Sequence, residues 1–438
     1  MHRKFDISAG AYSVVAQLQG AGFETYIVGG AIRDLLLKRK PKDFDISTSA
    51  TPEEVRHVFG RRRARIIGKR FRLTHVTVDG ELFEVSTFRR APQIHAGESG
   101  NEKFQQMPEN MIVSDNSYGT STEDAFRRDF TVNALFYDPV NCELIDHTGM
   151  GLKDIEDRVV RAIGEPALRF EEDPVRMIRA LKLVAQFDFS LDAATENALF
   201  ASLPFLQHAS SGRLSLELEK ILKSSSCDRH FEVFFDYGLL TLFLPFLASV
   251  WGSSMQKTAI DLLYERNCRV DAGIYRDSIS LALAAAALPF AEAELGRVDE
   301  VLWDKRDEES NDILLRIVRD IFAPQTLMVK VRESAVRILF TLSMLEHAGD
   351  AAVSTLIRHK SYAHARELLM IRHLAAGENI AALEMRYPRG RDPRDFRNPE
   401  RNSRNLRNQD NGGGRSRRRL FRKSGRRPEV KPYFDDRD

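Results

Sequence analysis

Residues 26–46 read YIVGGAIRDLLLKRKPKDFDI, and this stretch decides the fold of the chain. Its last part places Asp43 and Asp45 on either side of Phe44. Residues two apart in a strand share a face, so both carboxylates project together while Phe44 turns into the core. Two carboxylates so close repel each other unless a cation lies between them, and the oxygen-ligated ion Mg²⁺ meets that need. The pair predicts a catalytic magnesium site; the alternative is a solvated strand end.

A glycine pair precedes these aspartates. Gly29-Gly30 ends the apolar run, and twelve residues separate Gly30 from Asp43. Backbone without a Cβ approaches a ligand closely, and the N–H groups of the segment behind it are placed to hold phosphate. A third carboxylate, Glu84, lies on a strand that we expect to return from a hairpin turn at residues 79–80. Carboxylate-bound metal facing a phosphate cradle is the arrangement for phosphoryl or nucleotidyl transfer.

A basic run, RRRARIIGKRFRLTHV, occupies residues 61–76. It follows a helix predicted from a capping box at Thr51 and Glu54, which should end at Gly60. A charge run is usually a solvated face, but its place beside the predicted metal site favours contact with phosphate or nucleotide. The candidate RNA-binding residues here are Arg61, Arg62, Arg63, Arg65, Lys69, Arg70 and Arg72.

The segment EDAFRRDFTVNAL, residues 123–135, combines apolar positions with charges. Its apolar residues should face the core, which leaves Arg127, Arg128, Asp129 and Asn133 as polar groups near the interior. Buried charges must be paired or bind something, and this set suits a triphosphate with a metal, or a nucleotide sugar. The alternative is a structural salt bridge between arginine and aspartate.

A helix should begin at EDPVRMIRAL, residues 172–181, with Asp173 as N-cap and Pro174 after it. Arg176 and Arg179, three residues apart, then share one helix face. An aspartate beside arginines offers both an acceptor and a donor to the edge of a nucleotide base. A structural cap with surface arginines is the alternative.

The composition is that of a globular protein: 438 residues, 43% apolar and 29% charged. This length allows two to four structural units. The chain contains no run of eighteen apolar residues, so we expect no transmembrane helix. The first residues lack the apolar core of a signal peptide, so secretion is not expected. Three scattered cysteines fit neither a disulfide framework nor a zinc site. We therefore expect a cytoplasmic location.

The last 53 residues, from 386 to 438, are strongly basic, with 18 Lys and Arg against 8 Asp and Glu. The remainder holds 47 basic and 55 acidic residues, so a mildly acidic body carries a tail of net charge +10. The tail has too few apolar residues for a core, which predicts disorder. Arginines with interspersed aromatics suit single-stranded RNA, and a solubilising tail is the alternative. The candidate contacts are Arg417, Arg418, Arg419, Arg422 and Lys423.

Five motifs together resemble the class II nucleotidyltransferases, the group of bacterial poly(A) polymerases and tRNA CCA-adding enzymes. They are GGAIRD (29–34), DFD (43–45), FEVSTFR (83–89), EDAFRRDFTVNAL (123–135) and EDPVRMIRAL (172–181), in the family's order. The resemblance covers residues 24–240. It implies an α+β architecture: a small nucleotidyltransferase head with a mixed sheet and flanking helices, then an all-helical neck and body.

The resemblance also implies roles position by position. Asp43 and Asp45 match the metal-binding pair. A third acid would complete the catalytic carboxylates, and both Glu84 and Asp129 are candidates. The nucleotide-binding positions are Gly29, Gly30, Arg33 and Asp34 for the triphosphate, Arg127, Arg128, Asp129 and Asn133 for ribose and phosphate, and Asp173 and Arg176 with Arg179 for the base. Lys182 stands where CCA-adding enzymes often have another arginine.

Residues 65–76 are similar to the segment that marks poly(A) polymerases against CCA-adding enzymes, and a basic tail is typical of the polymerases. The resemblance therefore implies addition of AMP from ATP to single-stranded RNA 3′ ends, with two Mg²⁺ ions and release of pyrophosphate. CCA addition is the nearest alternative. A non-catalytic RNA-binding protein and a small-molecule nucleotidyltransferase are the others.

The expected organisation has five parts: a lead-in helix (1–23), the catalytic head (24–150), a helical neck that binds base and RNA (151–240), a helical body (241–385) and the basic tail (386–438). We expect a monomer, with the tail as a docking segment for RNA-degradation or RNA-chaperone proteins.

Overall fold

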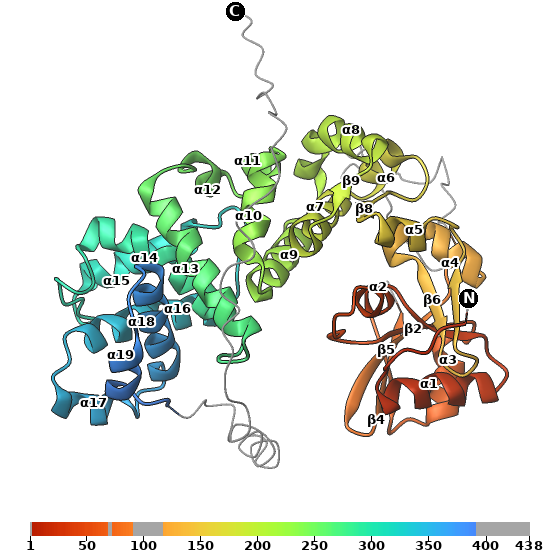
Figure 1. Cartoon of the computed structure of the whole chain (residues 1–438), viewed down its shortest axis with the longest axis horizontal. Helices are drawn as coiled ribbons and strands as arrows, with labels where there is room; N and C mark the ends of the chain where they lie inside the picture. The colour runs from red at the N-terminus through yellow and green to blue at the C-terminus, as the bar shows by residue number, and fades with distance from the viewer. Residues whose placement is uncertain (1, 69–71, 91–116, 391–438) are drawn as a thin grey trace, which may run out of the picture. The chain divides into compact units, whose positions relative to one another are not determined.

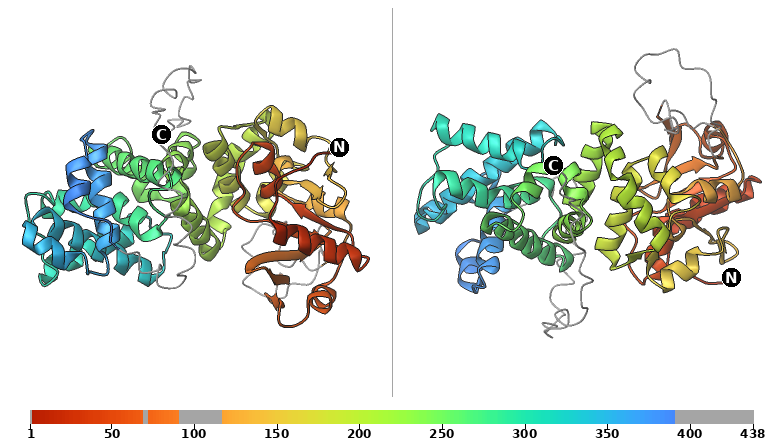
Figure 2. Two further views of the ribbon diagram at one scale, coloured as in Figure 1. Left: turned by 60° about the horizontal axis from the view of Figure 1, so that its bottom comes forward. Right: turned by 90° about the horizontal axis from the view of Figure 1, so that it is seen from above.

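The computed structural model describes residues 2–68, 72–90 and 117–390. It divides into two compact units, Met1–Glu217 and Leu218–Asp438. The first unit combines a β-sheet with helices, and the second is helical throughout its described part (Figures 1 and 2). The expected α+β class, with a mixed sheet followed by helices, is confirmed. The finer division into five parts stays a prediction.

A mixed seven-stranded sheet forms the centre of the first unit, in the order β3-β4-β5-β2-β1-β6-β7. Only the β2–β5 pair is parallel among these neighbours. The strands are β1 (Thr25–Val28), β2 (Asp45–Thr48), β3 (Ala64–Ile67), β4 (Leu73–Val78), β5 (Glu81–Thr87), β6 (Leu135–Asp138) and β7 (Glu143–Asp146). The central place of β2 puts the start of the acidic strand between β1 and β5.

Two helices, α1 (Ala9–Gly20) and α3 (Pro52–Phe59), pack against one side of the sheet. The predicted capping box of α3 is present: the Thr51 side chain accepts from the Glu54 N–H, and the Glu54 carboxylate accepts from the Thr51 N–H. The helix ends before Gly60, as expected. The hairpin turn between β4 and β5 is also confirmed, with positive φ angles at Asp79 and Gly80.

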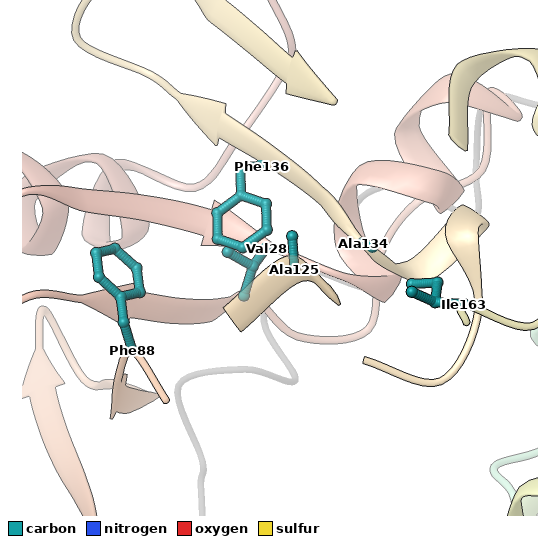
Figure 3. Close-up of a cluster of buried hydrophobic side chains, with 6 residues drawn as sticks. All are labelled: Val28, Phe88, Ala125, Ala134, Phe136 and Ile163. Carbon is teal, nitrogen blue, oxygen red and sulfur yellow. The ribbon is translucent and has the colours of Figure 1, made fainter. Parts of the chain in front are cut away.

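A hydrophobic cluster lies on the other side of the sheet, under α4 (Ser121–Arg127) (Figure 3). Val28 and Phe136 come from neighbouring strands, and Ala125 comes from α4. The remaining members are Phe88, Ala134 and Ile163. Burial of these side chains fixes α4 over the sheet, so that the arginines at the end of α4 lie beside the start of β2.

The rest of the first unit is mainly helical. Its elements are α2 (Gly30–Leu36), η2 (Thr131–Asn133), α5 (Gly151–Glu156), β8 (Val159–Val160), α6 (Pro166–Glu172), α7 (Val175–Phe187), β9 (Ser190–Leu191), α8 (Ala193–Ser202), η3 (Leu203–His208) and α9 (Ser211–Lys223). Strands β8 and β9 form a separate parallel pair. Helix α9 continues from the first unit into the second.

The second unit is built around the apolar helix α14, whose residues from Leu281 to Leu288 are almost fully buried. Its other helices are α10 (Cys227–Asp236), α11 (Leu239–Phe243), α12 (Pro245–Ser249), α13 (Ser254–Asp271), α14 (Ile279–Leu295), α15 (Glu308–Asp320), α16 (Val329–Glu346), α17 (Asp350–Leu356), α18 (Tyr362–Ala375) and α19 (Ala381–Arg386). Just beyond α19, Tyr387 is buried and its hydroxyl donates to the Leu345 carbonyl.

No helix in the described part of the chain is long and apolar enough to cross a membrane. Residues 391–438, which make up most of the predicted tail, lie outside the described residues. The prediction for the tail therefore stays a prediction. The structure describes its first five residues, 386–390, in which Arg386 ends α19 and Tyr387 is buried.

Candidate active site

The acidic pair lies where β2 begins. Strand β2 starts at Asp45, so the expectation that Asp43 also belongs to the strand was wrong. Phe44 is half-buried and not a core residue, because the chain enters the sheet only after it. Val28 pairs with Asp45, and Ile46 pairs with Val85, which places Glu84 beside Asp45 on the neighbouring strand.

The acidic side chains near Asp45 act on one another electrostatically. Asp45 is exposed at the strand end, but the protein packed around it, together with Asp43 and Glu84, raises its pKa to about 6. Arg128 works in the opposite direction. A carboxylate with a raised pKa beside two others marks a place where negative charge lacks compensation and where a cation would be favoured.

The donor set fits a hard cation bound partly by substrate. No three Asp, Glu, His or Cys side chains in the described part of the chain are grouped closely enough to hold a metal by themselves. Mg²⁺ is commonly bound by one or two carboxylates together with water and substrate phosphates. Asp43 and Asp45 would supply such a pair of oxygen ligands at the start of β2.

The glycine turn between β1 and α2 packs against the arginine motif. Gly29 has a φ of 73°, and a Cβ there would lie 3.1 Å from Nη1 of Arg128. Any other residue would therefore be strained and crowd the guanidinium. Arg33 on α2 donates from Nη1 to Oδ1 of Asn133 (2.6 Å), and its Nη2 donates to Oδ1 of Asp34 (2.7 Å). The structure thus brings the first motif and the RRD segment together.

Arginines gather at the carboxyl end of α4. Burial and the neighbouring guanidinium groups of Arg89, Arg128, Arg176 and Arg169 lower the pKa of Arg127 to about 9. Arg128 donates from Nη2 to Asp124 (2.9 Å) and lies 3.3 Å from the Ser47 hydroxyl on β2. A cluster of half-buried guanidinium groups this close to the acidic pair is suited to a polyanion such as a triphosphate.

Glu172, at the end of α6, holds two of these arginines. Its Oε2 accepts from Nη1 of Arg169 (2.7 Å) and from Nη1 of Arg176 (2.9 Å). Arg169 also donates from Nη2 to the carbonyls of Arg127 and Arg128 (2.6 and 2.7 Å). The guanidinium of Arg169 thereby caps α4 and ties α6 to the RRD segment.

Asp173 was predicted as the N-cap of α7, but the structure places the N-cap at Pro174 and Asp173 between α6 and α7. The Asp173 carboxylate still accepts from the start of α7 and also binds an arginine of α9. Oδ1 accepts from the Val175 N–H (3.2 Å), and Oδ2 accepts from Nη2 of Arg213 on α9 (2.7 Å). Arg176 is buried and forms an ion pair with Glu172, whereas Asp173 forms one with Arg213. The two residues predicted to read the base are therefore each fixed by a different partner.

A second set of charges joins the RRD segment to α7 and α9. Asp129 accepts from the Asn133 side chain (3.2 Å), and its Oδ2 lies 3.7 Å from Arg179. Glu217 on α9 lies 3.9 Å from Arg179 and accepts from Lys182 (2.6 Å). Asp129 thus has partners away from β2, whereas Glu84 is one of the groups that act on Asp45. This geometry favours Glu84 as the third carboxylate.

Residues 25–161 match a family described as "Poly A polymerase head domain", and residues 188–250 match "Probable RNA and SrmB- binding site of polymerase A". Poly(A) polymerase I of Haemophilus influenzae is 33% identical over 384 residues, covering 86% of this chain and 83% of that protein. The chain belongs to the poly(A) polymerase family. It is therefore a nucleotidyltransferase. Poly(A) polymerase I of Escherichia coli O157:H7 is also 33% identical, over 84% of this chain and 78% of that protein.

CCA-adding enzymes are also similar to this member of the poly(A) polymerase family. The CCA-adding enzyme of Geobacillus thermodenitrificans is 37% identical, but over only 54% of this chain and 55% of that protein. A crystal structure of the Bacillus stearothermophilus CCA-adding enzyme in complex with CTP has a TM-score of 0.57 and 26% identity, covering 86% of this chain and 81% of that one. The shared fold confirms the predicted nucleotidyltransferase architecture.

The predicted RNA-binding residues of this poly(A) polymerase family member divide into three groups. Arg61, Arg62 and Arg65 are exposed around the edge strand β3. Arg63 is also exposed but donates to the Phe59 carbonyl, and Arg72 is paired with Glu53. The others, Lys69, Arg70, Arg417, Arg418, Arg419, Arg422 and Lys423, lie outside the described residues.

Sequence reasoning missed five residues that hold this family member's site together: Asp124, Arg169, Glu172, Arg213 and Glu217. Two of them had a local signal, because Asp124 precedes Arg128 by four residues and Glu172 precedes Arg176 by four, the spacing of helical ion pairs. Arg213 had none, since it lies forty residues from its partner Asp173.

Proposed function

We propose that this chain is a poly(A) polymerase that adds AMP from ATP to RNA 3′ ends without a template. The observation that carries the proposal is an acidic pair at the start of β2 beside a half-buried arginine cluster, in a chain similar to Poly(A) polymerase I over most of its length. Carboxylates and guanidinium groups arranged in this way suit the charges of a metal-bound triphosphate.

In the proposed reaction, the RNA 3′ oxygen attacks the α-phosphorus of ATP. A phosphodiester bond forms, and the bond to the β-phosphate breaks as pyrophosphate leaves. The arginines near the end of α4 hold the phosphates and neutralise the charge on the leaving pyrophosphate. Gly29 and Gly30 allow the triphosphate to approach the backbone, and Arg33 and Asp34 border it. Asp129 and Asn133 contact the ribose.

Asp43 and Asp45, with Glu84 next to them, would hold Mg²⁺ with substrate oxygens completing its shell. The bound ion supplies charge neutralisation and makes the RNA 3′ hydroxyl a better nucleophile. Asp173 and Arg176 present an acceptor and a donor to the base of the incoming nucleotide. Arg179 lies beside them on α7. Arg213 and Glu172 fix the two base-reading side chains in place.

RNA affinity would come from the exposed arginines of residues 61–65 and from the basic tail. These groups would bind phosphates of any sequence, as is suitable for a polymerase without a template. We propose a monomer located in the cytoplasm. Proteins of RNA degradation or RNA-chaperone proteins would dock on the tail, whose net charge is +10.

CCA addition to tRNA is the second candidate, because CCA-adding enzymes match the head and part of the helical region. The test is incubation with each labelled NTP separately, on tRNA lacking CCA and on an unrelated RNA. The proposal expects a ladder of A on both RNAs. Use of CTP with arrest after three nucleotides on tRNA alone would show CCA addition, and no incorporation would leave a non-catalytic RNA-binding protein. Transfer only to a small molecule would show the remaining alternative.

A further inference from the structure

Strands β3, β4 and β5 form one half of the sheet, and one of its faces is covered. Val76 and Val78 on β4 and Phe83 and Val85 on β5 point to this face and are buried. The helices that pack closely on these strands are α1 and α3, and Gly10 of α1 lies directly on the Phe83 ring. The alternation of side chains in a strand therefore assigns the other residues to the opposite face.

This opposite face, here named the open face, is accessible in the described structure. Arg65 on β3, Thr77 on β4 and Glu84 on β5 are exposed there, and His75 is half-buried. Leu82 is 58% exposed and supplies an apolar side chain to this face. An uncovered face that offers both an apolar side chain and cations is suited to a ligand.

The register of the strands orders these side chains in a row. Arg65 pairs with His75, and His75 pairs with Glu84, with Nε2 of His75 3.5 Å from Oε1 of Glu84. Strands β2 and β5 are parallel, and Ile46 pairs with Val85. The residues before this pair, Asp45 and Glu84, therefore lie next to each other. Three strand spacings of about 4.8 Å put Arg65 roughly 14 Å from the Asp45 column, the length of about four stacked nucleotides.

The charges along the row change sign toward the acidic pair. Arg61, Arg62 and Arg65 are exposed at the β3 edge and provide positive charge. Among the described residues of the open face, the negative charge comes from Glu84 on β5. An RNA strand with its 3′ hydroxyl at the carboxylates would bring its preceding phosphates to the basic edge. A neutral or acidic protein segment would not match this order of charges.

The position of the arginine cluster gives the direction of approach. Arg128 lies close to the turn that follows β1 and to the carbonyl of Asn133, whereas β5 lies on the other side of β2. In phosphoryl transfer the nucleophile and the leaving group lie roughly in line on opposite sides of the phosphorus. A triphosphate held between Arg128 and the Gly29 turn, next to β1, therefore leaves the β5 side for the attacking RNA.

We propose that the open face binds the 3′-terminal nucleotides of the RNA substrate, with Arg65 at a phosphate and Leu82 and His75 against base or ribose. This assignment rests on the proposed polymerase function. It separates the open face, which positions the 3′ end, from the basic tail, which supplies general affinity.

Steady-state kinetics of the full chain with ATP and an oligoadenylate primer test the proposal. Arg65→Glu and Leu82→Glu should each raise the KM for primer by about tenfold, with the KM for ATP changed less than about twofold. In a binding assay, Arg65→Ala should also reduce the steepness of the plot of log binding constant for RNA against log salt concentration by about 0.7. This is the contribution of one phosphate contact to a single strand. Circular dichroism checks that each variant is folded, and Leu82→Ala provides a milder replacement of the same side chain.

Two matched controls use exposed residues away from the open face. Lys4 follows Arg3, which bonds to Cys142 beside the opposite edge strand β7, and Tyr12 is exposed on α1. Lys4→Glu and Tyr12→Glu should leave both KM values unchanged. An equal rise of the primer KM in these controls would overturn the assignment, because it would reflect the net charge alone.

A cross-linking experiment gives an answer that does not depend on turnover. RNA with 4-thiouridine at its 3′ end, irradiated with the Asp45→Asn chain, should cross-link to residues 73–86. Cross-links confined to Leu218–Asp438, or unchanged primer KM in both open-face variants, would overturn the inference, and the open face would then be free for a protein or a second copy. If the unmodified chain incorporates no AMP at all, the proposed function itself fails.

Discussion

At the residue scale, the raised pKa of Asp45 predicts that this carboxylate lowers the stability of the fold. The raised pKa means that the folded chain keeps a proton on Asp45 at pH values where the unfolded chain has lost it. Stability should therefore fall as pH rises from the ordinary aspartate pKa of about 3.9 to about 6, and the penalty should be complete above pH 6.

Replacement of Asp45 by Asn removes this penalty. Because Asp45 is exposed, we discount the full electrostatic value and expect Asp45→Asn to raise the free energy of unfolding by about 1 kcal/mol at pH 8 without Mg²⁺. The gain should vanish below pH 4, where both states of the wild type are protonated. Urea denaturation over this pH range measures it. A variant that is less stable than wild type at pH 8 would show that the acidic pair is not under repulsion.

Glu172 is a second single residue on which the candidate site depends, because its carboxylate accepts a charged hydrogen bond from Arg176. Glu172→Gln keeps the shape of the side chain but removes its charge, which weakens the grip on both Arg169 and Arg176. We expect the KM for ATP to rise about tenfold, corresponding to a charged hydrogen bond of 1.5 kcal/mol or more, with the primer KM unchanged. Equal ATP kinetics in variant and wild type would mean that Arg176 does not touch the nucleotide.

At the scale of elements, the short helix α4 carries Arg127 to the site and depends on its cap. The Thr120 side chain accepts from the Glu123 N–H, and the Glu123 carboxylate accepts from the Thr120 N–H. Thr120→Ala should lower the free energy of unfolding by about 1 kcal/mol and raise the KM for ATP.

The matched control for this prediction is Thr51→Ala, since Thr51 forms the same capping box on α3, which holds no nucleotide-site residue. It should cost about the same stability and leave the KM for ATP unchanged. Thermal unfolding and ATP kinetics of the two variants together separate the stability of a helix from its role in placing arginines. If both variants had the same KM for ATP, the claim that α4 positions the arginines for the nucleotide would be wrong.

The elements that sequence predicted well are those with local signals. The α3 capping box and the turn at Asp79-Gly80 are set by residues within four positions of each other, so the pattern identifies them. The N-cap of α7 lies one residue later than predicted, and the bond between Arg213 and the Asp173 carboxylate joins residues forty apart, which no local pattern indicates. Likewise, the motifs name the candidate nucleotide-site residues, but the ion pairs between α6, α7 and α9 depend on the tertiary fold.

For the whole molecule, the contacts of the last described residues before the tail decide where a truncation should be made. The Arg366 side chain donates to the Tyr387 carbonyl (2.5 Å), and the Tyr362 hydroxyl donates to the Pro388 carbonyl (2.9 Å). These bonds, together with the buried Tyr387 ring, fix residues 387 and 388 on α18 and α16. A truncation that removes them disturbs the fold as well as the tail.

Truncation after Gly390 removes 16 basic and 8 acidic residues and leaves these contacts intact. We expect unchanged thermal stability, weaker RNA binding and a flatter dependence of binding on salt. Truncation before Arg386 should in addition lower the free energy of unfolding by about 2 kcal/mol, the value of one large buried side chain. Filter binding at several salt concentrations and thermal unfolding measure both. An unchanged salt slope after the shorter cut would make the tail a solubiliser only.

The most direct measurement of the central claim is the transfer of labelled AMP from ATP to an RNA primer by wild type and by Asp45→Asn, with and without Mg²⁺. The acidic pair beside the arginine cluster predicts a Mg²⁺-dependent ladder of A for the wild type. It predicts no extension by the variant, even though the variant still binds RNA and is folded. Extension at the wild-type rate by Asp45→Asn would contradict the claim that this acidic pair is the catalytic centre.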